Sequence, residues 1–102
     1  MKGWRLRRTA RAEQDLFEIW AYIAAEDESA ADRTIDMIRT AIGRAADFPR
    51  LGRTLSWLPD DHRVLASGSY LLFYQLLEAE RELLLIRVLH GARDLRAIFE
   101  SD

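Results

Sequence analysis

The sequence contains no cysteine, which excludes disulfide bonds and every zinc, iron–sulfur or thiol site that needs a thiolate ligand. Its two histidines, His62 and His90, lie 28 positions apart, so we expect neither a histidine-rich metal site nor a cofactor. Fifteen basic residues against seventeen acidic ones leave no excess positive charge that would attract nucleic acid in bulk. Lys2 is the single lysine, and arginine supplies the other basic side chains.

Long apolar runs are also missing. The longest, residues 70–77, is far shorter than the roughly 20 residues that a membrane-spanning helix needs. The basic segment at residues 2–11 is not followed by the apolar core of a signal peptide. We therefore expect a cytoplasmic protein without membrane contact, folded as one domain over residues 1–102.

The first quarter of the chain has the pattern of a strand followed by a helix. Apolar and basic residues alternate over residues 4–8, which predicts a short strand with Trp4 and Leu6 on its buried face. Thr9 is placed to cap a helix over residues 10–25. The apolar stripe of this helix consists of Ala12, Leu16, Ile19, Trp20 and Ile23.

A second helix follows an acidic break at residues 26–28. Ser29 and Asp32 form a variant of the capping box, which predicts Ser29 as the N-cap. Because the link is short, the two helices should form an antiparallel hairpin. The apolar positions of the second helix are Ala31, Ile35, Ile38, Ile42 and Ala45.

The second half of the chain has the pattern of a small sheet. Residues 48–61 show neither helical nor strand periodicity and predict a long apolar loop. Residues 62–67, 70–77 and 83–90 predict three strands of an antiparallel meander, and Asp94 is placed to cap a short helix at residues 94–100. The sequence thus predicts an α+β fold in the order β-α-α-β-β-β plus a short C-terminal helix, with the helical hairpin packed on a small antiparallel β-sheet.

The last two predicted strands lack the alternation of a half-exposed sheet. Thirteen of their sixteen residues are apolar or aromatic, and Gln75, Arg87 and His90 are the exceptions. One helical hairpin covers one face only, so the second face needs another cover. That cover is the loop and tail of the same chain, another subunit, or a separate partner chain.

Four motifs occur in a fixed order along the chain. They are Asp15-Leu16-x-x-Ile19-Trp20-x-Tyr22-Ile23, Phe48-Pro49-x-Leu51-Gly52, Tyr70-Leu71-Leu72-Phe73-Tyr74 and Arg87-Val88-Leu89-His90-Gly91-Ala92-Arg93-Asp94. In this order they resemble the ParE branch of the ParE/RelE toxin superfamily over nearly the whole chain. The resemblance implies a small α+β toxin encoded beside a ParD-like or similar antitoxin that wraps it, and a complex of the two on operator DNA.

The resemblance implies one of two activities, because ParE-like toxins poison DNA gyrase whereas RelE-like toxins cleave mRNA on the ribosome. The fold is common to both and does not choose between them. RelE-like nucleases are described as using a cluster of lysine and arginine with a tyrosine or histidine, and the single lysine here weighs against the lysine-based form. A relative that is not toxic and acts only as a corepressor is a third reading.

Nuclease chemistry needs a base, a cation and an acid around the phosphate. Candidates on neighbouring predicted strands are Arg63, Arg87 and His90, together with Tyr70 or Tyr74. In the structural alternative, Arg87 and Arg93 pair with nearby carboxylates such as Asp94, and His90 caps the end of its strand. His62, next to Asp61, is expected to be a solvated loop residue.

A gyrase poison needs a recognition surface and no catalytic group of its own. The residue types that most often anchor interfaces occur in the loop and in the tail. The candidates are Arg53, Trp57, Arg93, Arg96 and Phe99. Trp57 serves equally well as a core residue under the loop. The arginines of the first strand are candidates for DNA phosphate contacts, or they protect a sheet edge from aggregation.

An antitoxin is expected to lie across the hairpin and the sheet as a helix in a groove or as an added strand. The candidate contacts are Leu16, Phe17, Trp20, Tyr22, Tyr70 and Tyr74. Phe17 and Tyr22 flank the apolar stripe of their helix and should be reached from outside.

Overall fold

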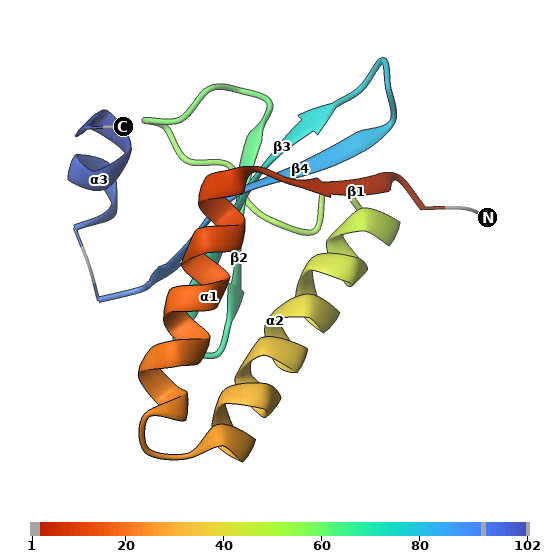
Figure 1. Cartoon of the computed structure of the whole chain (residues 1–102). Helices are drawn as coiled ribbons and strands as arrows, with labels where there is room; N and C mark the ends of the chain where they lie inside the picture. Colours follow the sequence, from red (N-terminus) through yellow and green to blue (C-terminus); the bar gives the residue numbers. More distant parts are fainter. Residues whose placement is uncertain (1–2, 93, 102) are drawn as a thin grey trace.

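The computed structural model describes residues 3–92 and 94–101, with side chains to residue 98, and it shows one sheet with a helical hairpin (Figure 1). The predicted element order is confirmed, with a short C-terminal helix at the end. The elements are β1 (Arg5–Arg8), α1 (Ala10–Ala24), α2 (Glu28–Asp47), β2 (His62–Ser67), β3 (Tyr70–Leu77), β4 (Glu82–His90) and α3 (Leu95–Ser101). The antiparallel hairpin of α1 and α2 extends away from the sheet (Figure 1).

The start of α1 is as predicted and the start of α2 is not. The hydroxyl of Thr9 accepts a hydrogen bond from the amide of Ala12 at 3.0 Å, so Thr9 is the N-cap of α1. The prediction that Ser29 caps α2 is wrong, because the carboxylate of Asp27 accepts from the amide of Ala30 at 3.0 Å. Asp27 has the extended backbone that an N-cap requires, and Asp is as good a cap as Ser, so the helix begins two residues earlier than predicted.

The sheet has the strand order β1-β4-β3-β2. The predicted antiparallel meander of β2, β3 and β4 is confirmed, and β1 adds to it in parallel, with Arg5 opposite Glu82 and Arg8 opposite Leu85. The arginine-rich β1 is therefore an edge strand, as its sequence suggested. The register between β3 and β4 shifts between Phe73 and Tyr74, so that Ile86 is an extra residue in β4.

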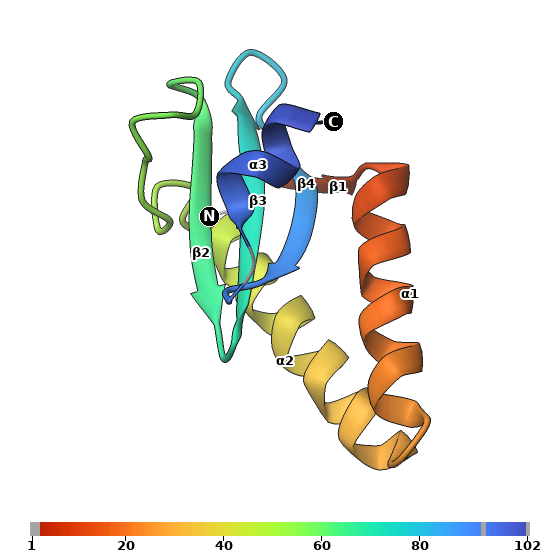
Figure 2. The same cartoon turned by 90° about the vertical axis from the view of Figure 1, so that its left-hand side faces the viewer.

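Each face of the sheet has its own apolar cluster. On the hairpin face, α2 packs Ile35, Ile38 and Ile42 against Leu72 and Leu83. On the opposite face, the cluster consists of Val64, Phe73 and Leu89, with Leu55, Trp57 and Leu58 of the loop and Leu95 and Ile98 of α3 packed on it. Figure 2 shows α3 lying across β3 and β4. The second face is thus covered by the loop and tail of the same chain, and a sheet face left open for a partner is not part of this fold.

The sequence analysis expected neither a membrane-spanning helix nor a histidine-rich metal site. Within residues 3–92 and 94–101, no helix has both the length and the apolarity needed to cross a membrane. In the same described residues, no group of three or more His, Asp or Glu side chains gathers as a candidate metal site.

A buried glutamate fixes β1 to the sheet. Glu82 begins β4, one residue before the predicted start, and its side chain is only 4% exposed. Its carboxylate accepts hydrogen bonds from both Arg5 and Arg7 of β1, with an Arg7 Nη1 to Oε1 distance of 2.9 Å. The hydrogen bond from Arg7, followed by that from Arg5, holds the pKa of Glu82 below its ordinary value of 4.5.

We expect Glu82→Gln to lower the stability of the fold at neutral pH. A lowered carboxyl pKa in the folded state stabilises the fold above the ordinary pKa, and this stability is lost as the pH falls through the lowered value. The variant should therefore lose part of the acid sensitivity that the wild type shows below about pH 4.5. Urea titrations between pH 3 and 7 measure this, with the exposed Glu78→Gln as the matched control. Equal acid sensitivity of the wild type and Glu82→Gln would contradict the assignment.

Candidate functional site

The two helices of the hairpin are joined by a polar contact near the tip. The indole nitrogen of Trp20 in α1 donates to the carboxylate of Asp32 in α2 at 2.8 Å. Below this contact, Leu16 and Ile35 are buried between the helices and the sheet. This hydrogen bond therefore fixes the position of α1 along α2, and the two helices together form one surface.

A groove of about 560 Å³ runs between α1 and α2, and we call it the hairpin groove. Leu16 and Ile35 lie at its floor, and the aromatic ring of Phe17 stands in it with 66% of the residue exposed. An aromatic side chain exposed to this degree on a folded domain is available to a partner. The groove is lined by Arg8, Glu13, Leu16, Phe17, Trp20, Asp32, Ile35, Asp36 and Arg39.

A second pocket of about 360 Å³ lies on the other side of α1, where the helix meets β3 and β4, and we call it the edge pocket. Tyr22, 84% exposed, comes from α1, and Tyr70 and His90 come from the paired ends of β3 and β4. The rings of Tyr70 and His90 meet edge to face at 5.4 Å. The pocket is lined by Asp15, Glu18, Ile19, Tyr22, Tyr70, Val88, Leu89 and His90.

The hairpin groove and the edge pocket contain five of the six candidates for antitoxin contact. Leu16, Phe17 and Trp20 line the hairpin groove, and Tyr22 and Tyr70 line the edge pocket. The predicted exposure of Phe17 and Tyr22 is confirmed, whereas Leu16 is 8% exposed and reaches the groove only at its floor. The sixth candidate, Tyr74, lies elsewhere.

Tyr74 is fully buried and supports the loop that follows α2. Its hydroxyl donates to the carbonyl of Pro49 and accepts from the amide of Gly52, both at 2.8 Å. A Cβ atom on Gly52 would lie 2.7 Å from this hydroxyl, so the close approach requires glycine. Burial raises the pKa of the Tyr74 phenol. Tyr74 is therefore unavailable both to an antitoxin and to a substrate, which corrects both sequence predictions for it.

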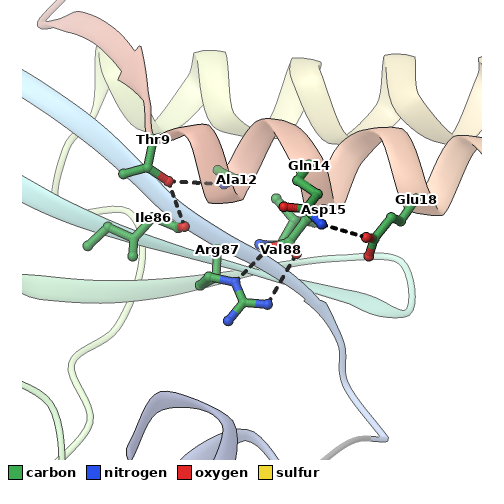
Figure 3. Close-up of polar contacts among 8 residues, drawn as sticks. All are labelled: Thr9, Ala12, Gln14, Asp15, Glu18, Ile86, Arg87 and Val88. Atoms are coloured by element: carbon green, nitrogen blue, oxygen red, sulfur yellow. Dashed lines mark hydrogen bonds and ion pairs between the residues drawn. The ribbon is translucent and has the colours of Figure 1, made fainter. Parts of the chain in front are cut away.

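Arg87 is committed to a buried ion pair with α1 (Figure 3). Its Nε lies 2.8 Å from Oδ2 of Asp15, and its Nη2 lies 3.1 Å from Oδ1 of the same carboxylate. The amide of Val88 also donates to Asp15, at 2.9 Å. Arg87 is thus paired with a carboxylate, as the structural alternative to a nuclease role predicted. The carboxylate is that of Asp15 in α1 and not the neighbouring Asp94.

The position of this ion pair follows from the sheet. β1 pairs with β4 only as far as Leu85, so the edge of β4 beyond that residue needs other partners. Thr9 donates its hydroxyl hydrogen to the carbonyl of Ile86 at 3.0 Å, and Asp15 accepts from Val88 (Figure 3). The start of α1 therefore takes the place of a missing neighbouring strand.

The four nuclease candidates belong to three separate sets of contacts, because Arg63 and Tyr74 both bind Gly52 whereas Arg87 and His90 lie elsewhere. Arg63 pairs with Tyr74 across β2 and β3 and donates to the carbonyl of Gly52 at 2.8 Å. Arg87 binds Asp15, while His90 is exposed at the end of β4, where its Nδ1 accepts from the amide of Ala92 at 3.1 Å. The expected convergence of these side chains on one phosphate site is not what the structure shows.

The predicted strand beginning at His62 is confirmed, but the expectation that His62 is a solvated loop residue is wrong, because its side chain is only 16% exposed. Its Nδ1 is 2.8 Å from Oδ1 of Asp61. A hydrogen bond from Gln75, followed by that from His62, lowers the pKa of the Asp61 carboxyl. This small network closes the turn before β2.

Among the described candidates for target contact, Trp57 and α3, which carries Arg96, lie on the face opposite the hairpin, and Arg53 lies at the β2 edge of the sheet. Arg53 is exposed and pairs through its backbone with Val64 at the outer side of β2. Trp57 is half-buried on the second apolar cluster, so the core reading of this residue holds, while Arg96 is exposed in α3. Arg93 lies outside the described residues, and Phe99 belongs to α3 with a side chain outside the described part.

The arrangement of one sheet, a projecting helical hairpin and a short last helix is similar to that of two solved bacterial toxins. It superposes on a toxin-antitoxin structure, the chromosomal ParDE system from P. aeruginosa, with a TM-score of 0.70 at 16% identity over 85% of this chain and 95% of the other. It superposes equally on a free mutant of the E. coli toxin RelE, with a TM-score of 0.70 at 13% identity over 95% and 93% of the chains. At these identities the likeness establishes the fold.

The family follows from sequence. The model of the ParE toxin of the type II toxin-antitoxin system parDE matches residues 6–95. Toxin ParE1 of Caulobacter vibrioides is 37% identical over 100 residues, which cover 95% of this chain and 97% of the relative. Toxin ParE1 of Mycobacterium tuberculosis H37Rv is 34% identical over 87 residues, which cover 82% and 86%. The chain belongs to the ParE family of type II toxins.

We expect Asp15→Asn to destabilise the fold by about 3 kcal/mol, because a buried guanidinium loses the carboxylate that it binds. Chemical denaturation measures the loss. The matched control is Glu18→Gln, which changes an exposed carboxylate one turn later in the same helix. Equal stabilities of the two variants would show that the ion pair does not hold α1 to β4.

Proposed function

We propose that this ParE-family toxin is neutralised by a cognate antitoxin bound to its helical hairpin and that its target is DNA gyrase. The observation that carries the second part is the commitment of Tyr74 and Arg87 to the core, which removes two of the four candidates for RNA cleavage. A toxin without a convergent catalytic site acts by binding. The proposal requires that it act in the cytoplasm, where gyrase works on DNA.

The hairpin is the best place for an antitoxin to bind. The hairpin groove and the edge pocket flank α1 on its two sides, and each presents an exposed aromatic residue, Phe17 and Tyr22. A partner helix laid in such a groove buries its apolar face against aromatic side chains. The solved relatives include the toxin-antitoxin complexes ParDE and RelBE, which supports a protein partner for this chain.

We expect Phe17→Ser to weaken antitoxin binding at least about 10-fold, since an exposed aromatic anchor is lost. The matched control is Phe48→Ser, because Phe48 is 68% exposed but lies at the end of α2, outside both grooves. Isothermal titration with the antitoxin measures the difference. Unchanged affinity in Phe17→Ser, or an equal loss in Phe48→Ser, would count against binding at the hairpin groove.

The surface for gyrase is proposed on the face opposite the hairpin, with Trp57 of the loop and Arg96 of α3, and at the adjoining β2 edge, with Arg53. Arg93 and Phe99 adjoin it in sequence. Exposed arginine and half-buried tryptophan side chains are common anchors of protein interfaces. Because this surface and the two grooves lie on different faces, variants should separate target binding from antitoxin binding.

We expect the purified toxin to inhibit DNA supercoiling by gyrase and to accumulate cleaved DNA. Arg53→Ala should weaken this inhibition by about 10-fold while leaving antitoxin affinity unchanged. Arg33→Ala, an exposed arginine on the hairpin, is the control that should keep full inhibition. Normal supercoiling in the presence of the wild-type toxin would refute gyrase as the target.

One observation favours the alternative, ribosome-dependent cleavage of mRNA. His90 is exposed beside Tyr70 in the edge pocket, and because its Nδ1 accepts a hydrogen bond, its Nε2 carries the proton when the ring is neutral. If the toxin were a nuclease, His90→Ala would abolish mRNA cuts and killing. If the toxin instead poisons gyrase, the His90→Ala variant should kill cells as effectively as the wild-type toxin.

A further inference from the structure

The hairpin groove has a charge gradient along its length. The contact between Trp20 and Asp32 sets the register of the two helices near the tip. Glu13 and Arg39 each lie seven residues from this contact, towards the sheet, which is about 10 Å at 1.5 Å per residue. Both therefore line the sheet end of the groove, at about the same level.

The two ends of the groove differ in charge. Asp32, at the contact with Trp20, makes the tip end acidic, and Asp36 lies one helical turn nearer the sheet, about level with Leu16. At the sheet end, the carboxylate of Glu13 pairs with Arg8 at 3.5 Å, so Arg39 gives this end an excess of positive charge. Arg33 lies on the same helix but does not line the groove. The apolar lining residues Leu16, Phe17 and Ile35 lie between Asp32 and Arg39, at about the level of Asp36.

We propose that this gradient selects and orients the segment of the antitoxin that fills the groove, an inference that rests on the function proposed above. The segment is an amphipathic helix with a cationic side chain facing Asp32 and Asp36, an apolar side chain on Phe17 and a carboxylate facing Arg39. One face of a helix presents residues every three to four positions, so successive turns meet these three parts. The cation and the carboxylate are accordingly one or two turns apart.

The charge gradient contributes more to the choice between antitoxins than to the affinity for any one of them. The charges that line the groove are exposed or partly exposed, so each attractive pair adds little affinity of its own. A segment of the opposite polarity places cation against Arg39 and carboxylate against Asp32 and Asp36, and both ends repel it. The groove therefore rejects antitoxins whose charges run the other way, even where their apolar residues fit.

The test uses the protein encoded by the reading frame adjoining that of this toxin, titrated into the full-length toxin. Arg39→Glu and Asp36→Lys should each weaken its binding about 10-fold, since attraction is replaced by repulsion. Arg33→Glu, the same change as at position 39 but outside the groove, should stay within about 2-fold of the wild type. Melting curves verify the fold, and the milder Arg39→Ala and Asp36→Asn replace any variant that does not fold.

The outcomes separate the two proposals. If the wild-type toxin does not bind the protein encoded by the adjoining reading frame, both the proposed neutralisation and the proposed role of the charge gradient are wrong. If the wild type binds but Arg39→Glu and Asp36→Lys behave like Arg33→Glu, the role of the charge gradient is wrong and the proposed neutralisation stands. If the reversals change self-association in analytical ultracentrifugation instead of antitoxin binding, the occupant of the groove is a second copy of this chain, which also overturns the inference.

Discussion

The carboxylate of Asp15 holds the two halves of this toxin together. It accepts hydrogen bonds from the guanidinium of Arg87 and from the amide of Val88, at the part of β4 that β1 does not reach. A buried ion pair of this kind is stable only with its hydrogen bonds complete, so the position of α1 on the sheet is fixed by it. Because α1 forms one side of both grooves, the surfaces proposed for the antitoxin depend on the same contact.

Most of the fold could be predicted from local patterns. Helical and strand periods identify the seven elements because their apolar stripes and turn residues agree with the tertiary packing. The cap at Asp27 was missed because two adjacent candidates, Asp27 and Ser29, satisfy the same rule. The sequence left three possible covers for the second sheet face, and the structure confirms the loop and tail of the same chain; the choice could not be made from sequence, because the apolar residues within 48–61 have no regular spacing that shows where they pack.

The candidate site was predicted in part. The exposure of Phe17 and Tyr22 follows from helical geometry, whereas the burial of Tyr74 depends on the path of the loop at Gly52. The partner of Arg87 could have been predicted from the sequence. Asp15 stands between Ala12 and Leu16 on the buried stripe of α1, and a carboxylate at such a position indicates a buried partner. No such pattern indicates the burial of Glu82, because in the sequence it ends the charged segment of residues 78–82 and in the structure it is the first residue of β4.

The parallel pairing of β1 with β4 joins the first strand of the chain to the last, across the whole hairpin and meander. A contact between segments so far apart in sequence forms slowly, because closing the long intervening loop costs chain entropy. During synthesis the N-terminal half leaves the ribosome without the strand that completes its sheet and without the arginine that anchors its first helix. The molecule thus acquires its finished surface only after β4 has been synthesised, so nascent chains that stop short of β4 lack the structure of the toxin.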